Sequence, residues 1–153
     1  MNILALDLGT KTGWAKLEDG QIFSGWQDNK GGRFEGGGMR YLHFKRFLSE
    51  AVPPGAVDMV VYEEVRRHVA TDAAHVYGGM MATLSAYCEE NSIPYQSVPV
   101  GTIKKHATGK GNASKDAMLA AMQAKHGPQV TSEDEADALA LLGWAMENWE
   151  VDV

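Results

Sequence analysis

Short apolar stretches separated by polar residues dominate the first part of the chain. Residues 2 to 8, 12 to 18 and 21 to 26 each have the length and apolar content of a β-strand. The Asp19-Gly20 pair between the second and third stretches is a strong signal for a tight hairpin turn. The pattern therefore predicts an antiparallel meander, followed by a flexible glycine-rich loop over residues 28 to 38.

Helical periodicity begins after this loop. Apolar residues recur at helical spacing over residues 39 to 52, and Pro53-Pro54 ends that element. Further along, the pattern predicts a buried strand at 57–63, a helix at 71–91, a strand at 93–98, and helices from 102, at 114–127 and at 132–149. Thr71 or Asp72 can cap the second helix and Thr102 the third, while Ser132 and Glu135 have capping-box spacing.

This order of elements predicts an α/β fold in a single domain covering residues 1 to 153. Three antiparallel strands are followed by two parallel strands that helical crossovers connect, which makes a mixed five-stranded sheet with helices on both faces. The helix at 71–91 carries a series of small residues, and that face fits either core packing or a dimer contact.

Composition and charge narrow the classes of function. A single cysteine, Cys88, excludes an intrachain disulfide. We expect a cytoplasmic protein, because the chain has neither a basic leader nor an apolar run of the roughly 20 residues that a membrane helix needs. The net charge is −6, but residues 133 to 153 contain seven acidic residues and no Lys or Arg, whereas five lysines face one aspartate between residues 100 and 128. A local basic surface is therefore compatible with nucleic-acid binding.

Carboxylates lie where the apolar pattern predicts buried side chains. Asp7 is the only charged residue among the first ten, and Asp137 is the only one between residues 136 and 146. Asp134 lies three positions before Asp137, so both carboxylates share one face of the predicted helix. Glu63 and Glu64 end an apolar strand, and periodicity does not choose between them because a strand buried on both faces does not alternate.

Buried carboxylates without basic partners are typical of a site for a hard divalent cation, here Mg²⁺ or Mn²⁺. Such cations, commonly bound as a pair, activate water for attack on a phosphodiester. The alternatives are structural. The acidic residues around position 134 also favour the positive end of a helix, and Asp7 can accept hydrogen bonds from the turn that follows it.

Three motifs together resemble the RuvC family of Holliday-junction resolvases, in the compact form that bacteriophages carry. The motifs are residues 3–10 (ILALDLGT), 61–65 (VYEEV) and 134–140 (DEADALA). The resemblance implies a ribonuclease H-like fold, with Asp7, Glu63, Asp134 and Asp137 as catalytic ligands of two Mg²⁺ or Mn²⁺ ions per active site. It also implies a homodimeric crossover junction endonuclease of DNA recombination and repair, which cuts four-way junctions in two like strands; activity on forks and flaps fits equally well.

Residues 109 to 115 resemble the segment of this family that lies beside the DNA backbone. By this resemblance Lys115 and one of Lys104 or Lys105 bind phosphates, with Lys110 in the same basic segment. The structural alternative for these lysines is an ordinary solvated helix face.

One departure from the family pattern concerns specificity. Three positions after the motif glutamate the family commonly has an aromatic residue that stacks on a base, whereas this chain has Arg66, followed by Arg67. An arginine side chain binds phosphate more readily than it stacks on a base. We therefore expect both arginines to contact DNA and selection to depend on branch shape rather than on a strict cleavage sequence.

Three other interpretations compete with this one. Residues 6 to 13 also resemble the first phosphate loop of actin-like ATPases and sugar kinases, but those proteins need a second domain and a second glycine-rich loop, and 153 residues hold neither. A YqgF-like ribonuclease of RNA processing has the same fold and differs in its substrate. A non-catalytic nucleic-acid-binding module is disfavoured by the presence of all four acids.

Overall fold

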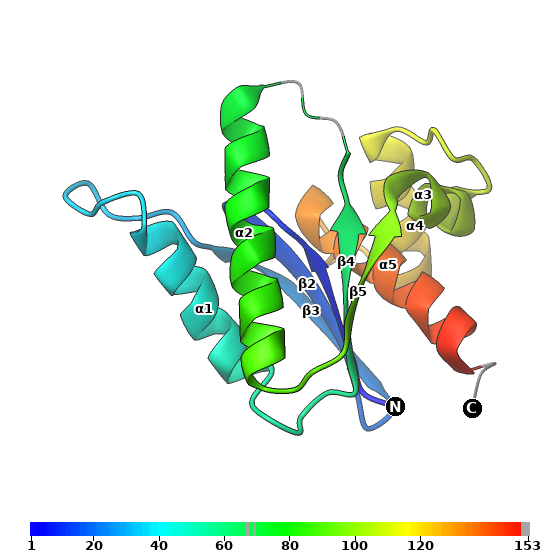
Figure 1. The fold of residues 1–153 in the computed structure, drawn as a ribbon. Coiled ribbons are helices and arrows are strands. Elements are labelled where there is room, and N and C mark those ends of the chain that lie inside the picture. Colours follow the sequence, from blue (N-terminus) through cyan, green and yellow to red (C-terminus); the bar gives the residue numbers. More distant parts are fainter. Residues whose placement is uncertain (67, 69, 151–153) are drawn as a thin grey trace.

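The computed structural model describes residues 1–66, 68 and 70–150 of the chain. Its five strands are β1 (Ile3–Asp7), β2 (Lys11–Glu18), β3 (Gln21–Asp28), β4 (Met59–Glu64) and β5 (Tyr95–Pro99). Its helices are α1 (Met39–Ala51), α2 (Thr71–Glu90), α3 (Val100–Thr108), α4 (Lys115–His126) and α5 (Glu133–Glu150). The strands form one sheet in the order β3-β2-β1-β4-β5, in which β1 to β3 are antiparallel and β4 and β5 run parallel to β1, as predicted (Figure 1).

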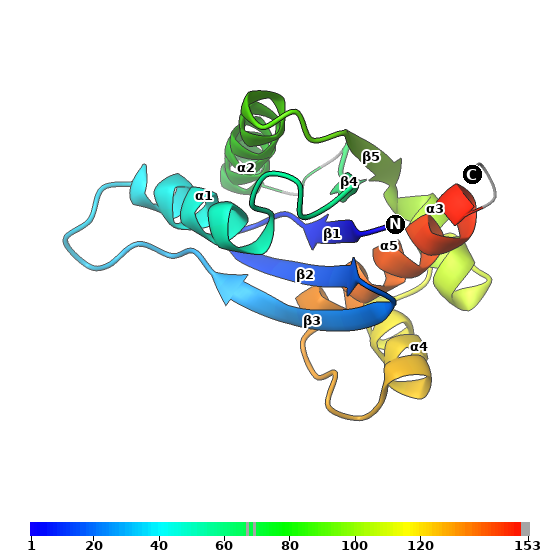
Figure 2. The ribbon, with the colours of Figure 1, turned by 90° about the horizontal axis from the view of Figure 1, so that it is seen from below.

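Helices cover both faces of the sheet. Successive side chains of a strand point to opposite faces, so each layer of helices packs against a different set of apolar strand residues. Helices α3, α4 and α5 lie on one face and α1 and α2 on the other (Figure 2). Ile3 and Ala5 of β1 pack in the core on the first face, and Leu4 and Leu6 in the core on the second. The central strands β1 and β4 are therefore buried on both sides. Within the described residues, no helix is both long enough and apolar enough to cross a membrane.

The element boundaries agree with the sequence pattern to within a few residues, and the predicted hairpin turn is present. Asp19 and Gly20 both have positive φ, 50° and 81°, as the tight turn between β2 and β3 requires. The predictions of two helix caps were wrong. Ala70 lies at the N-cap of α2 and Pro99 at the N-cap of α3, and neither helix has a side-chain cap. Helix α3 follows β5 directly, so Thr102 lies inside the helix.

The small residues of α2 have two different environments. Gly79 packs against the ring of Tyr41 on α1, and an added Cβ would come within about 2.4 Å of that ring. An added Cβ on the neighbouring Gly78 would meet nothing within 4 Å. Gly79 therefore serves the packing of α2 on α1, whereas Gly78 has open space beside it within the described residues.

Candidate metal centre

Three carboxylates from three elements meet at one edge of the sheet. Asp7 ends β1 and Glu63 lies one residue before the end of β4, and these parallel neighbours bring their carboxyl ends to the same edge. Asp137 comes from the second turn of α5, which packs on β1 and β2. One carboxylate oxygen from each of the three residues lies within 4.8 Å of the other two.

A glycine allows α5 to approach the sheet at this point. Gly13 of β2 pairs with Asp7, and a Cβ added to it would lie 1.8 Å from the backbone oxygen of Asp134. No side chain larger than hydrogen fits there unless the start of α5 moves. Gly13 therefore sets the distance between the carboxylates of α5 and the carboxylate of β1.

We expect Gly13→Ala to lower the free energy of unfolding by about 2–3 kcal/mol, because the added methyl group overlaps the backbone of α5. Urea denaturation measures the loss. Gly36→Ala is the matched control, since its added methyl group meets nothing within 4 Å. Equal stability of the two variants would show that α5 does not need this close approach.

The cluster is electrostatically strained in the absence of cations. Burial, followed by repulsion from Glu63, Asp137 and Asp134, raises the pKa of Asp7 well above its ordinary value. Burial also raises the pKa of Glu63. Burial, with repulsion from Glu63 and Asp134, raises the pKa of Asp137 to about 7, against the opposing effect of two lysines. The folded chain thus holds together three acids whose ionised forms repel one another.

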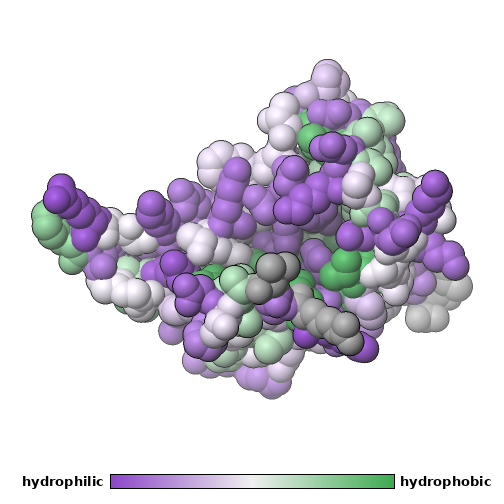
Figure 3. Space-filling view, turned by 90° about the horizontal axis from the view of Figure 1, so that it is seen from above, coloured by the Kyte–Doolittle hydropathy of each residue, from purple (hydrophilic) through white to green (hydrophobic). Residues whose placement is uncertain are grey.

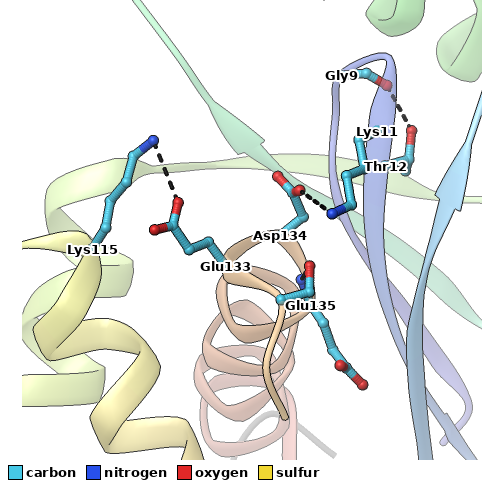
Figure 4. Close-up of polar contacts among 8 residues, drawn as sticks. Gly9, Lys11, Thr12, Lys115, Glu133, Asp134 and Glu135 are labelled. Carbon is cyan, nitrogen blue, oxygen red and sulfur yellow. Dashed lines mark hydrogen bonds and ion pairs between the residues drawn. The ribbon is translucent and has the colours of Figure 1, made fainter. Parts of the chain in front are cut away.

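The fourth predicted ligand, Asp134, lies at the rim of this cluster. It is not among the three residues whose oxygens share the 4.8 Å cluster, although its carboxyl group is close enough to Asp7 to raise the pKa of Asp7. Its Oδ2 lies 4.0 Å from Nζ of Lys11 on β2, and Nζ of Lys115 lies 3.6 Å from Oε2 of Glu133 (Figure 4). Lysines therefore flank the start of α5 on both sides.

The structure separates the residues that the sequence left as alternatives. Glu63 joins the cluster, whereas the carboxylate of Glu64 accepts a hydrogen bond of 2.9 Å from Nε of the exposed Arg66. Lys104 and Lys115 line a cavity of about 110 Å³ together with Glu63 and Asp137.

Three other predicted DNA-binding residues are not among the described residues that line this cavity. Lys105 and Lys110 are exposed and do not line the cavity. Arg67 lies outside the described residues.

The residues present fit a site for hard divalent cations. The cluster offers carboxylate oxygens alone, which are the ligands that Mg²⁺ and Mn²⁺ prefer. Lys115 and Lys104 lower the pKa of Asp137 but leave it at about 7, so they offset the effects of burial and repulsion only in part. Bound cations would offset the burial of these charges and their mutual repulsion, which together raise the pKa values.

Two features of the site had no signal in the sequence. Lys11 lies beside Asp134, and its Nζ is 4.2 Å from the centre of the Trp26 ring. The position of this lysine at the start of a strand does not predict either contact. The turn after Asp7 is held by a buried network, in which the hydroxyl of Thr12 donates to the Gly9 carbonyl (2.8 Å) and the Asn29 amide donates to the Thr12 hydroxyl (3.0 Å). Only contacts between distant segments expose that role.

Comparison with known sequences points to one kind of nuclease. No protein-family model matches the chain. The crossover junction endodeoxyribonuclease RuvC of Brachyspira hyodysenteriae is 37% identical over 101 residues, which cover 66% of this chain. The matched segment spans 61% of that relative's own length.

Comparison with solved structures identifies the fold. Thermus thermophilus RuvC matches with a TM-score of 0.76 at 18% identity, covering 96% of both chains. The same protein in complex with a Holliday junction substrate matches with a TM-score of 0.74 at 19% identity, covering 92% of this chain and 89% of that one. The yeast mitochondrial Holliday junction resolvase Ydc2 matches with a TM-score of 0.62 at 16% identity, covering 94% and 77%. The chain therefore has the ribonuclease H-like fold of these resolvases, as predicted.

Proposed function

We propose that this chain is a RuvC-type crossover junction endonuclease of the compact, bacteriophage type, which hydrolyses phosphodiesters at four-way and other branched DNA junctions. The observation that carries the proposal is the cluster of Asp7, Glu63 and Asp137 at the edge of a RuvC-like sheet. The 37% identical relative is named as an enzyme of this activity. One solved structure of the same fold is a complex with a Holliday junction substrate.

Asp7, Glu63 and Asp137 would hold two Mg²⁺ or Mn²⁺ ions, with Asp134 at the rim as the fourth ligand. When bound, the ions supply the activation of a water molecule and the neutralisation of charge on the departing oxygen. The contribution of the chain itself is to position the carboxylates. Parallel pairing of β1 and β4 aligns two of the carboxylates, and the close approach at Gly13 fixes those of α5.

Lys104 and Lys115 would hold the phosphate at the cut. The support for this role is that both line the cavity that Glu63 and Asp137 also line. Exposed Arg66, Lys105 and Lys110, together with Arg67, would bind more of the backbone. Such contacts add affinity without sequence information, in agreement with selection by branch shape.

A homodimer with two sites would cut two like strands of a junction. The support for this assembly is the open space beside Gly78 on α2, which offers room to a second backbone. A two-fold symmetric pair of sites matches the two-fold symmetry of a four-way junction.

The test is cleavage of matched four-way junction, fork, linear duplex and structured RNA by the purified chain with Mg²⁺ or Mn²⁺. Paired symmetric nicks in the junction are the expected result. Cutting of RNA alone would assign the chain to RNA processing instead. Junction binding without metal-dependent cutting of any substrate would leave only a nucleic-acid-binding module.

We expect Lys115→Ala to weaken DNA binding to a similar extent on every sequence and to reduce the slope of log affinity against log salt by about one phosphate contact. The Lys115 side chain is 80% exposed and its ion pair with Glu133 is long, at 3.6 Å. The ammonium group of Lys115 is therefore available to a phosphate. Lys125→Ala, at the other end of α4, is the matched control. Fluorescence anisotropy over a series of salt concentrations measures both slopes, and identical slopes would remove Lys115 from the interface.

A further inference from the structure

The loop between β3 and α1 projects from the body of the molecule (Figures 1 and 3). Its first residue, Asn29, is fully buried, and the Asn29 backbone N–H donates a 2.8 Å hydrogen bond to the carbonyl of Thr10. Thr10 belongs to the turn that follows Asp7. The projecting loop is therefore rooted at the same end of the sheet as the carboxylate cluster, on the strand two places from β1.

The tip of this loop is a closed turn. The backbone N–H of Glu35 donates to the carbonyl of Gly32 (3.0 Å), and the N–H of Gly32 donates to Oε1 of Glu35 (2.7 Å). The other oxygen of this carboxylate lies 3.4 Å from Nε2 of His43 on α1. These contacts attach the tip to the helix and leave Arg33 and Phe34 at its apex.

Phe34 is presented to solvent almost completely. Its 94% exposure is the largest among the exposed large hydrophobic side chains of the described residues. Single exposed apolar residues are ordinary on protein surfaces. Phe34 differs because a closed turn holds it outward, and because the guanidinium of Arg33 lies 5.5 Å from the centre of its ring.

We propose that Phe34 stacks on an unpaired or end-exposed base at the branch point of the DNA substrate, while Arg33 binds the adjacent phosphate. An aromatic ring beside a guanidinium suits a nucleobase beside its phosphate. The interior of a linear duplex offers no free base face, whereas a branch does, so this contact recognises branching. The inference rests on the proposed function and names how that function selects its substrate.

Charge favours nucleic acid over a protein partner at this loop. Lys30, Arg33 and Arg40 lie in or next to the loop, and the only acid between residues 29 and 40 is Glu35. Over residues 28 to 40 these three cations outnumber the acids Asp28 and Glu35, which leaves a net charge of +1 on the segment.

The test is binding of the full chain, in EDTA to prevent cutting, to a four-way junction with 2-aminopurine at the branch and to a linear duplex of the same length. We expect Phe34→Ala to weaken junction binding about tenfold, to leave duplex binding unchanged and to abolish the change in 2-aminopurine fluorescence. Phe34→Trp should preserve that change. Phe23→Ala, which removes a half-exposed phenylalanine outside the loop, is the control.

Three outcomes would overturn the proposal. Equal junction binding by wild type and Phe34→Ala would reject the stacking contact and leave the nuclease function standing. A change in sedimentation of Phe34→Ala without DNA would assign the loop to contact with a second copy of the chain. Failure of the wild type to bind any junction would reject the proposed function and this inference together.

Discussion

Asp7→Asn is expected to reduce junction cleavage by at least about a thousandfold, because it removes a metal ligand from the centre of the cluster and with it several kcal/mol of charge stabilisation. Junction binding should be unchanged or tighter, since the variant has one negative charge fewer beside a phosphate. Asp7 is the most constrained of the acids, because it ends a buried central strand and burial dominates the rise of its pKa. Single-turnover cleavage and anisotropy measure the two quantities separately.

Adjacent glutamates supply the matched control for this experiment. Glu63→Gln should behave like Asp7→Asn, whereas Glu64→Gln should retain cleavage because Glu64 pairs with Arg66 outside the cluster. Wild-type cleavage by Asp7→Asn would show that the cluster is not the active site. Loss of cleavage in Glu64→Gln, with cleavage retained in Glu63→Gln, would show that Glu64 and not Glu63 belongs to the active site.

The parts of the site that the sequence predicts are those that violate the apolar pattern. Asp7 and Asp137 stand out because each is a lone charge in an apolar segment, and burying a charge needs a compensating partner. The choice between Glu63 and Glu64 depended on a resemblance, because β4 is buried on both faces and has no alternation to read. Contacts in the folded chain supply that information.

Features that depend on distant segments were beyond the sequence pattern. Lys104 and Lys105 are neighbours of the same type, and the packing of α3 decides that Lys104 lines the cavity. The close approach of Gly13 to Asp134 joins residues far apart in the chain. The two wrong cap predictions, for α2 and α3, have a local cause. A Thr or Asp residue can cap a helix, but its presence does not show at which residue the preceding segment ends and the helix begins.

Asp137→Asn is expected to stabilise the metal-free protein while removing its activity. The pKa of Asp137 is raised to about 7 in the folded chain, against roughly 3.9 when unfolded. The folded state therefore binds the proton of Asp137 more tightly, so the stability that this group contributes is fully present below about pH 4 and is lost as pH rises through about 7. At pH 8 in EDTA the Asn variant, which has no charge to desolvate, should be more stable by about 2–4 kcal/mol.

Mg²⁺ should reverse this order. Cations that bind the folded wild type and not the unfolded chain raise its stability in proportion to the logarithm of their concentration, and the variant lacks a ligand for them. Urea denaturation at pH 5 and pH 8, with EDTA or with Mg²⁺, gives the four values needed, and Asp116→Asn on the exposed start of α4 is the control. A wild type indifferent to both pH and Mg²⁺ would mean that the folded chain already satisfies these acids without a cation. A variant that gains more stability at pH 8 in EDTA than at pH 5 would instead show that the burial and repulsion of ionised Asp137 oppose folding, and that the site is maintained for the cations it binds.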